Sequence, residues 1–458
     1  MKNHRFCQSI QRFRQEINHA IGYPIVVATI VTLFAWNGLA SAESRPAEFV
    51  PFRDFVNQTA AASASDYLAR PESRVKDTAS FEEMRQHVLN LYKGVEVYHS
   101  FVLDSGHYDC IPIEQQPAVR KYGLKSIASP PVLEETADAN GEALDGFAKP
   151  ALQLDPDKPF DTFGNSVHCE EHTIPMRRVT LDTLTRFQTL RQFFQKSPEG
   201  AERVAGQNPE FTPGGAAHKY SFTFETVDNL GGNSNLNVWS PFVDTSKGEV
   251  FSLSQEWYVG GSGANTQTDE VGWVVYPDMF GDEKSHFFIF STPDNYVTGC
   301  WNNSCGDFVQ TGSSGLLGAS FNHYSAFGKT QYEFSARYYL HNGNWWLYYG
   351  GKAVGYYPLA MYKGGQNSKH AQVIEFGTES VGTTVWPPEG SGDWPSKGFK
   401  YAAYQRNLYY TNTSKKKVWD SLSPDIPSPA CYSVGGPNSG TGAWTVYFYE
   451  GGPGGSGC

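Results

Sequence analysis

The C-terminal half of the chain, from Lys219 onward, consists of short apolar runs that turn residues separate. These runs are rich in aromatic and β-branched residues, the composition that strands favour. Many short antiparallel strands in one domain of this size predict a β-sandwich or a barrel. The runs are YSFTFETV, LNVWSPFV, EVFSLSQEWYV, VGWVVYP, HFFIFST, YEFSARYYL, NWWLYYGG and AWTVYFYE.

One hairpin can be placed from the pattern alone. Asn342-Gly343 lies between two of the runs, and Asn-Gly is a strong signal of a hairpin turn. In the run that follows, Trp345 and Leu347 share one face of a strand, whereas Trp346 lies on the other. Both faces carry bulky side chains, so we expect this strand to be covered on both sides or to line a groove.

The N-terminal half mixes helical and strand-like patterns. Apolar spacings of three and four predict a helix at 81–92 and a second, amphipathic helix at 178–194. Between them, the run at 95–103 reads as a strand. Residues 43–80 lack strong periodicity, and we expect a poorly ordered lead there. The pattern predicts a smaller mixed α/β domain at 81–195.

Two further segments divide the chain. Residues 196–217 are polar, contain Pro and Gly and lack periodicity, so they predict a linker and the preferred place for a processing cut. Residues 218–458 then form the β domain. At the other end, residues 1–42 combine a basic opening, an apolar run and the small residues Ala40-Ser41-Ala42, which predicts a signal peptide.

The apolar run at 25–36 is too short to span a bilayer. We therefore expect a secreted chain, extracellular or periplasmic, with no membrane attachment after signal cleavage. An uncleaved membrane anchor is the alternative interpretation. The net charge of −11 argues against nucleic acid as a partner.

The cysteines agree with export. The chain has 7 cysteines, and one of them, Cys7, lies in the predicted signal peptide. An even number in an exported chain predicts disulfides, although the sequence leaves the pairing open. No CxxC pair is present to suggest a zinc knuckle. The pairs that we favour are Cys110–Cys169, Cys300–Cys305 and Cys431–Cys458.

Several motifs of the chain resemble the neprosin family. The resemblance covers most of residues 85–458 and extends into the N-terminal half through Asp109-Cys110. The matching residues are Asn237-Val-Trp239, Ser252-Leu-Ser-Gln255-Glu-Trp257, Glu270-Val-Gly-Trp273, Pro277-Asp-Met-Phe-Gly281-Asp282, Thr298-Gly-Cys300-Trp-Asn302, Cys305-Gly-Asp-Phe308, Val354-Gly-Tyr-Tyr-Pro358 and Ile374-Glu-Phe-Gly377-Thr-Glu379.

The resemblance implies a glutamic peptidase with a lectin-like β-sandwich, which uses two glutamates and a water without metal, cofactor or covalent intermediate. It also implies cleavage beside proline and an acid-activated zymogen, in which the pro-domain acts as an intramolecular inhibitor. By motif position, the catalytic glutamates fall on Glu270 and Glu379. One departure is Gly377-Thr378, where the family usually has two glycines before the second glutamate.

Two carboxylates that share one proton suit peptide hydrolysis, because one takes a proton from water while the other polarises the carbonyl. Outside the resemblance, either glutamate is more simply a solvated surface group. Glu375 competes with Glu379, because it lies two strand steps away on the same face. Candidate substrate contacts are Gln255, Trp257 and Trp273, although Trp273 also fits a core position.

Other function classes remain open. His168-Cys-Glu-Glu171-His172 matches an inverted zinc-peptidase pattern, but the nearby Gly164 and Pro175 disfavour the helix that this chemistry needs. No G-x-S-x-G elbow is present, so a serine hydrolase is disfavoured. A glycan-binding or glycan-cleaving sandwich is the alternative function, because aromatic platforms and paired carboxylates suit sugars. A catalytically inactive binding protein of the same fold is the third class.

Overall fold

The computed structural model describes residues 48–104, 106–133, 148–196 and 217–458. The predicted signal peptide and nearly all of the predicted linker lie outside these residues. Within the described residues, every helix is too short or too polar to cross a membrane. The contact pattern groups Ser44–Cys458 as one compact unit.

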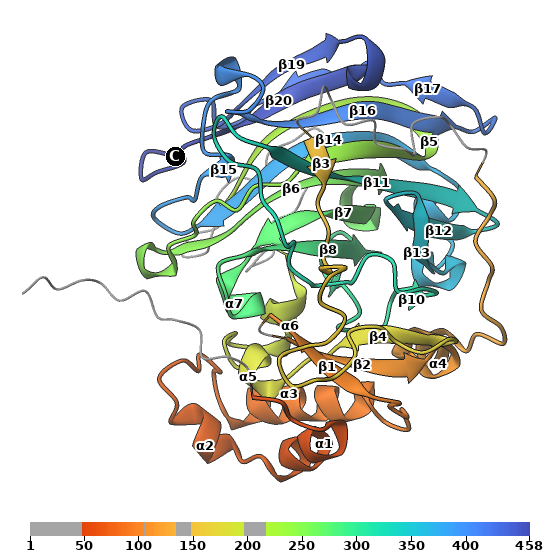
Figure 1. Ribbon diagram of the computed structural model, residues 1–458, viewed down its shortest axis with the longest axis vertical. Coiled ribbons are helices and arrows are strands. Elements are labelled where there is room, and N and C mark those ends of the chain that lie inside the picture. Colours follow the sequence, from red (N-terminus) through yellow and green to blue (C-terminus); the bar gives the residue numbers. More distant parts are fainter. Residues whose placement is uncertain (1–47, 105, 134–147, 197–216) are drawn as a thin grey trace, which may run out of the picture. The chain divides into compact units, whose positions relative to one another are not determined.

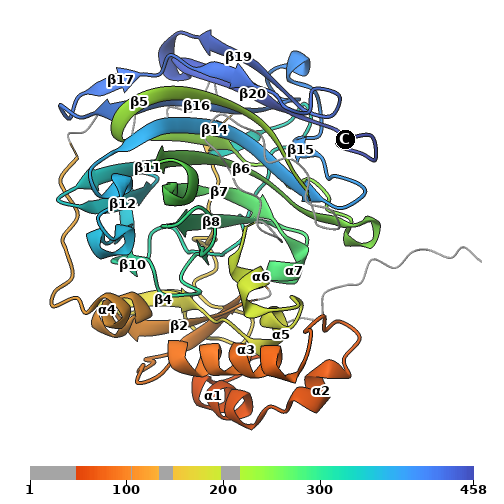
Figure 2. The same cartoon turned by 180° about the vertical axis from the view of Figure 1, so that it is seen from behind.

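The C-terminal part is an antiparallel β-sandwich, as the pattern predicts (Figure 1). Its first layer has the strand order β5-β14-β6-β7-β8-β9. These strands are long and curved, and they run side by side in the views of Figures 1 and 2. Their bounds are β5 (Ala217–Asn237), β6 (Glu249–Gly260), β7 (Gln267–Val275), β8 (Ser285–Thr292), β9 (Cys300–Trp301) and β14 (Ala371–Gly382).

β5 belongs to both layers of the sandwich. Its first half pairs with β14, whereas its second half pairs with β11 and β16 of the second layer. The bounds in the second layer are β10 (Val309–Gln310), β11 (Gln331–His341), β12 (Asn344–Tyr349), β13 (Lys352–Tyr357), β15 (Glu389–Gly390), β16 (Ala403–Asn412), β17 (Lys417–Trp419), β18 (Ser423–Asp425), β19 (Ser433–Ser439) and β20 (Val446–Gly452).

The main core fills the space between the two layers. Trp273 and Ile289 of the first layer pack there with Phe334 and Trp345 of the second. Each of these strands therefore has one face in this core and another face directed away from it. The outer face of the first layer is the face on which the candidate site lies.

The predicted hairpin joins β11 and β12. Asn342 and Gly343 have φ values of 50° and 79°, and the flanking His341 pairs with Asn344. Positive φ at both central residues is the requirement of a type I′ turn. The strand that follows is covered on both faces, because Trp345 packs in the main core while Trp346 packs in a second cluster with Ala118.

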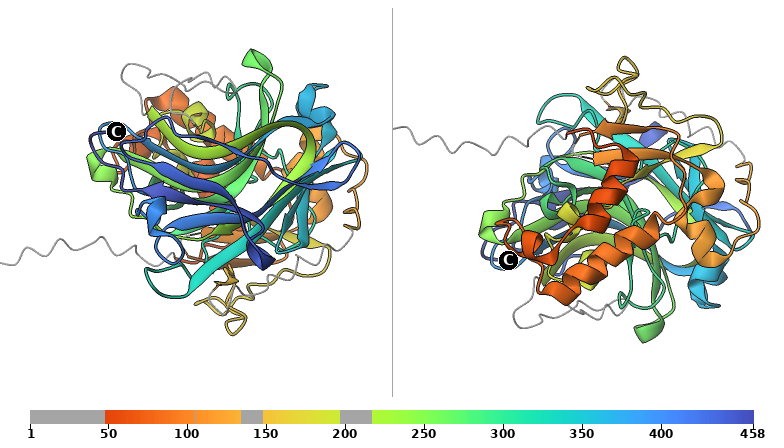
Figure 3. Two further views of the ribbon diagram at one scale, coloured as in Figure 1. Left: turned by 90° about the horizontal axis from the view of Figure 1, so that it is seen from above. Right: turned by 90° about the horizontal axis from the view of Figure 1, so that it is seen from below.

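Helices and a small sheet form the N-terminal part, which lies below the sandwich in Figure 1 and faces the viewer in the right panel of Figure 3. The sheet has the order β1-β2-β4. The bounds are α1 (Phe52–Ala61), α2 (Ala64–Leu68), α3 (Thr78–Leu91), β1 (Ser100–Leu103), β2 (Gly106–Pro112), α4 (Pro117–Tyr122), β3 (Ala148–Pro150), β4 (Thr173–Arg177), α5 (Leu181–Leu184) and α6 (Leu190–Phe194).

Two expectations for this part were wrong. The poorly ordered lead at 43–80 contains helices α1 and α2 in its described residues, and Phe55 anchors α1 in the core. The single helix at 178–194 is two short helices instead. Thr189 is the reason, because its side chain accepts a hydrogen bond from the Gln192 backbone and so starts a new helix.

The N-terminal part shares its core with the sandwich. Leu184 and Phe193 pack in one cluster with Leu253, Phe288 and Phe290, which project from the outer face of the first layer. In addition, β3 pairs in parallel with β11 of the second layer. The two parts are therefore held together both by burial of apolar surface and by backbone pairing.

Three disulfides link the pairs that the sequence analysis favoured. Cys110 is bonded to Cys169, Cys300 to Cys305, and Cys431 to Cys458. The first lies within the N-terminal part, and the other two lie within the sandwich. No disulfide among the described residues joins the two parts.

Candidate active site

Neighbouring strands of the first layer bring Glu270, Glu379 and Gln255 onto one face. In the strand register, Gln255 of β6 stands opposite Gly377 of β14 and Gly272 of β7. Glu379 and Glu270 lie two residues from these glycines on their strands, so all three polar side chains project to the same side. Gln255 and Glu270 are fully buried, and Glu379 is 2% exposed.

The two glycines beside Gln255 are required by close packing of the strands. A Cβ atom on Gly377 would lie 2.4 Å from the Ser221 carbonyl oxygen, and one on Gly272 would lie 2.0 Å from that of Ser254. Neighbouring backbone, rather than open space, therefore occupies these positions. Gly377 therefore permits the close approach of β14 to β5, and Gly272 permits that of β7 to β6, which carries Gln255.

A lysine from the N-terminal part lies between the two glutamates. The Nζ atom of Lys196 is 2.5 Å from Glu270 Oε2 and 2.7 Å from Glu379 Oε2. The same ammonium donates to Gln255 Oε1 at 2.9 Å. Lys196 is only 3% exposed, so its charge is compensated by the carboxylates rather than by water.

Two further donors orient the Glu270 carboxylate. Tyr296 Oη donates to Glu270 Oε1 at 2.9 Å, and Thr268 Oγ1 donates to the same oxygen at 2.8 Å. Its other oxygen faces Lys196. These two hydrogen bonds fix the direction in which its second oxygen points.

The Glu379 carboxylate has a histidine on its other side. His218 Nδ1 lies 2.5 Å from Glu379 Oε1, and Gln255 Nε2 donates to Oε2 at 3.1 Å. Burial alone would raise the pKa of Glu379, but the charge of Lys196 and the hydrogen bond from His218 outweigh it and lower this pKa to about 2. While Lys196 is in place, Glu379 is therefore ionised at neutral and mildly acid pH.

An aromatic wall continues the same face beyond the glutamates. Trp257 packs with Tyr220 and Phe222, and its ring centroid lies 5.5 Å from Lys196 Nζ. Trp257 therefore lies beside the candidate pair. Trp273 does not, because it is in the main core on the opposite face of β7, where its Nε1 donates to the Asn237 carbonyl. The suggested substrate contact of Trp273 is therefore wrong.

Glu375, the competitor for the second position, lies on the same face of β14 as Glu379 and is 5% exposed. The contacts of Lys196, by contrast, select Glu270 and Glu379 as the two carboxylates that face one another. Thr378 lies on the reverse face of β14, where its hydroxyl donates to the buried Glu389. The departure from the family pattern is Thr378 in place of a second glycine. Its side chain therefore lies on the opposite face of β14 from the candidate pair.

A second polar layer lies directly behind the site, inside the sandwich. Ser221 and Ser380 each donate to Glu389 at 3.0 Å, and Ser254 donates to Glu450 at 2.6 Å. Burial raises the pKa of both Glu389 and Glu450 to about 8, although these donors lower it in part. The sheet that carries Glu270 and Glu379 therefore rests on two neutral carboxyl groups at acid pH.

No sequence pattern indicated a role for Lys196, His218 or Tyr296. Lys196 stands at the edge of the predicted linker, where an isolated lysine is ordinarily a solvated group. Only the tertiary packing of α6 on the sheet reveals its position. The zinc-peptidase pattern at 168–172 is not helical, and its Cys169 is part of a disulfide.

Comparisons with known proteins give a family match and two distant structural neighbours. Residues 248–453 match the family model described as Neprosin, and this range includes the strands of Glu270 and Glu379. A structure of scytalido-glutamic peptidase with a transition state analog inhibitor has 10% identity and a TM-score of 0.30, over 52% of this chain and 98% of that chain. A structure of the same peptidase with a peptide based analog has 9% identity and a TM-score of 0.29, over 51% and 98%.

Proposed function

Because the chain belongs to the neprosin family, we propose that it is a secreted glutamic endopeptidase in which Glu270 and Glu379 hold the hydrolytic water. Family membership supports a glutamic peptidase-like hydrolase that acts on protein or peptide substrates. The observation that carries the assignment of these two residues is the contact of one ammonium group, that of Lys196, with both carboxylates.

The position of the Lys196 Nζ atom corresponds to the position of the water. A water there donates to one carboxylate, which takes its proton as the oxygen attacks the peptide carbonyl. The second carboxyl, protonated at acid pH, gives its proton to the carbonyl oxygen, so that a tetrahedral diol forms. The first carboxyl then passes the proton that it took from water to the leaving nitrogen as the C–N bond breaks, and a diol hydroxyl returns a proton to the second carboxylate. Gln255 Nε2, which donates to Glu379 in the described state, is placed to stabilise the developing oxyanion.

In this proposal the described chain is a latent precursor. Lys196 fills the water position and pairs with both carboxylates, while Phe193 and its neighbours cover the adjoining sheet. A cut within 197–216, followed by departure of the N-terminal part, uncovers the glutamates. The proline preference comes from the family resemblance, and the Trp257 wall supplies an aromatic surface on which a proline ring can pack.

Cleavage of a proline-containing peptide at acid pH tests the proposal. Wild type is compared with Glu270→Gln and Glu379→Gln, each processed at the linker by an added protease so that self-processing is not required. We expect both variants to lose at least about a thousandfold in kcat, since each removes a proton-transfer partner. Chelator and serine-protease inhibitor should leave the wild-type rate unchanged.

A matched variant is Glu375→Gln, on the same strand face as Glu379. It should keep most of the activity. Retention of activity in Glu379→Gln together with its loss in Glu375→Gln would move the second carboxylate to position 375. A wild type without activity on any peptide would favour a binding protein of the same fold.

A further inference from the structure

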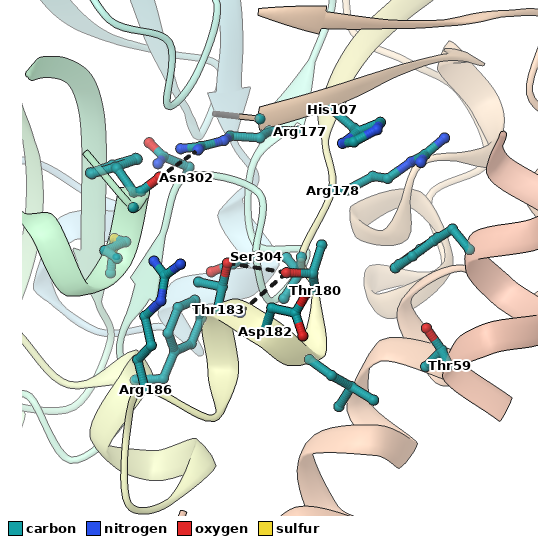
Figure 4. Close-up of a pocket in the computed structure, with 18 of the residues that line it drawn as sticks. Thr59, His107, Arg177, Arg178, Thr180, Asp182, Thr183, Arg186, Asn302 and Ser304 are labelled. Atoms are coloured by element: carbon teal, nitrogen blue, oxygen red, sulfur yellow. Dashed lines mark hydrogen bonds between the residues drawn. The ribbon is translucent and has the colours of Figure 1, made fainter. Parts of the chain in front are cut away.

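A pocket of about 600 Å³ lies between the N-terminal part and the sandwich, away from the glutamates. One wall comes from α1, β4, α5 and α6, and the other from the segments 279–281 and 301–304 (Figure 4). A volume of this size accommodates a small organic molecule. Because each part supplies one wall, the pocket exists only while the two parts are together.

Three arginines line the pocket, and they differ in their partners. Arg178 is neutralised, because it forms a buried ion pair with Asp109 at 2.7 Å. Arg177 donates to the backbone carbonyls of Gly318 and Phe280 and has no carboxylate within ion-pair distance among the described residues. Arg177 therefore carries a charge into the pocket without a counter-ion.

Arg186 is the second uncompensated arginine. Of the acids whose charges act on it, Asp182 is paired with Arg70 at 2.6 Å and Asp278 with Arg74 at 2.5 Å, and the third, Glu72, is exposed. Among the described residues, its hydrogen bond is a long contact of 3.3 Å to the Asp278 carbonyl. Burial lowers the pKa of Arg186 despite these neighbouring acids, as expected for a guanidinium whose desolvation is incompletely offset.

The two guanidinium groups lie on the same side of the pocket in Figure 4, and Arg178 lies on the other. Arg177 stacks on Phe280 with its Cζ 4.8 Å from the ring centroid. Beside this cationic end, the lining combines polar side chains such as Thr59, Asn302 and Ser304 with an apolar group made of Phe55, Phe193, Met279, Trp301 and Leu317. A cationic end and an apolar body are the complement of an amphipathic anion.

We propose that this pocket binds an organic carboxylate whose head group pairs with Arg177 and Arg186 and whose apolar body lies against Phe193 and Met279. A fatty acid and the C-terminal residue of a peptide share this chemistry. Since the ligand requires both walls, its binding also stabilises the association of the two parts by mass action. That consequence for latency rests on the proposed function, whereas the binding itself does not.

Calorimetric titration of the full-length chain at neutral pH tests the proposal, with octanoate and N-acetylphenylalanine as probes. We expect one molecule of at least one probe to bind per chain. Arg186→Gln should weaken that binding about tenfold or more, the value of a charge-assisted hydrogen bond to a carboxylate. Arg53→Gln, which changes an exposed arginine of α1 outside the pocket, should bind like wild type.

A further variant and the choice of probe distinguish between the possible results of this titration. Arg186→Lys keeps the charge, so partial retention of binding would support a pairing role if Arg186→Gln proved poorly folded. Tighter binding of octanoate supports a fatty acid as the source, and tighter binding of N-acetylphenylalanine supports a peptide C-terminus. Equal binding by wild type and Arg186→Gln, saturation by inorganic phosphate alone, or no binding of either carboxylate would overturn the proposal. Peptidase activity enters none of these measurements.

Discussion

Lys196 donates to Glu270 from a position 74 residues earlier in the chain, with Nζ 2.5 Å from Oε2. Both side chains are almost completely buried. Two carboxylates and one ammonium leave a net negative charge, and His218 Nδ1 lies 2.5 Å from Glu379 on the other side. Removing one partner from such a buried cluster of charges leaves the others uncompensated, which is strongly destabilising. Lys196 of the N-terminal part and the two glutamates therefore stabilise each other.

The first prediction concerns Lys196→Ala in the full-length chain. Removing the ammonium leaves two buried carboxylates facing one another, and we expect a loss of about 3–5 kcal/mol in the free energy of unfolding at neutral pH. Peptide cleavage by the intact chain should rise, because the water position is opened. Thermal unfolding and initial rates, with gel analysis to show that the chain is uncut, measure the two effects.

Lys93→Ala is the matched control, since Lys93 is exposed. Lys93→Ala should change neither the free energy of unfolding nor the rate of peptide cleavage by the intact chain. An intact Lys196→Ala chain that is as stable and as inactive as wild type would show that the lysine neither supports nor blocks the site.

The second prediction is an acid-dependent weakening of the same contacts. The pKa of Glu379 lies at about 2 in the described state, because Lys196 and His218 outweigh the effect of burial. A lowered pKa contributes stability that is complete above the unfolded value, near 4.5, and is lost as the pH falls toward 2. Tryptophan fluorescence, which reports on Trp257 beside Lys196, should change over this range.

The same titration with Glu379→Gln should lack most of this change, because the amide does not titrate. A transition of equal size in the variant would assign the acid sensitivity to other carboxylates between the N-terminal part and the sandwich. Asp278 and Asp307 are examples, because each pairs with a basic residue of the N-terminal part.

Much of the site could be anticipated because strand periodicity is simple. The positions of Glu270 and Glu379 came from the family resemblance, whereas the shared face of Glu375 and Glu379 follows from the two-residue repeat of a strand. The same rule places Trp273 opposite to Glu270, three residues away, so its core position was also readable. Which strands become neighbours depends on long-range pairing, and the sequence pattern does not encode it locally.

The N-terminal part was harder to predict for a different reason. The apolar positions of 178–194 are correct, since Leu181, Leu184 and Leu190 are all buried, but the helix is interrupted at Thr189. Local capping chemistry there overrides the helical period. Lys196 follows directly after this segment, and its role depends on where α6 docks, which only tertiary packing decides.

The third prediction concerns the two neutral carboxyls behind the sheet. Burial raises the pKa of Glu389 and Glu450 to about 8. A raised pKa contributes stability that is complete below the unfolded value and declines as the pH rises toward the folded value. The free energy of unfolding should therefore fall between about pH 4.5 and 8, by the order of a few kcal/mol for each group.

Glu389→Gln should flatten this dependence, whereas Glu83→Gln on the exposed side of α3 should keep it. Urea unfolding at several pH values gives the comparison. Together with the prediction for Glu379, this means that mild acid raises the free energy of unfolding of the sandwich. Stronger acid then weakens the contacts between Lys196 and the glutamates. A pH-independent wild type between pH 5 and 8 would contradict the assignment of neutral carboxyls.

The last prediction tests the close approach of β14 to β5 at Gly377. A Cβ atom on Gly377 would lie 2.4 Å from the Ser221 carbonyl oxygen and 2.5 Å from Phe222. Both contacts involve β5 backbone, which cannot move without disturbing its pairing with β14. Gly377→Ala should therefore lower the free energy of unfolding by about 1–3 kcal/mol. Because Glu379 is two residues away, a shift of β14 should also lower kcat in the processed enzyme.

Gly312→Ala is the control for Gly377→Ala, since the nearest atom to its added Cβ lies 3.4 Å away. It should be close to neutral in both thermal unfolding and peptide cleavage. If Gly377→Ala instead unfolded at the wild-type temperature with full activity, β5 and β14 would not approach one another as closely at this position. Lowered kcat with unchanged stability would locate the effect in the placement of Glu379 relative to Glu270, rather than in the packing of the sheet.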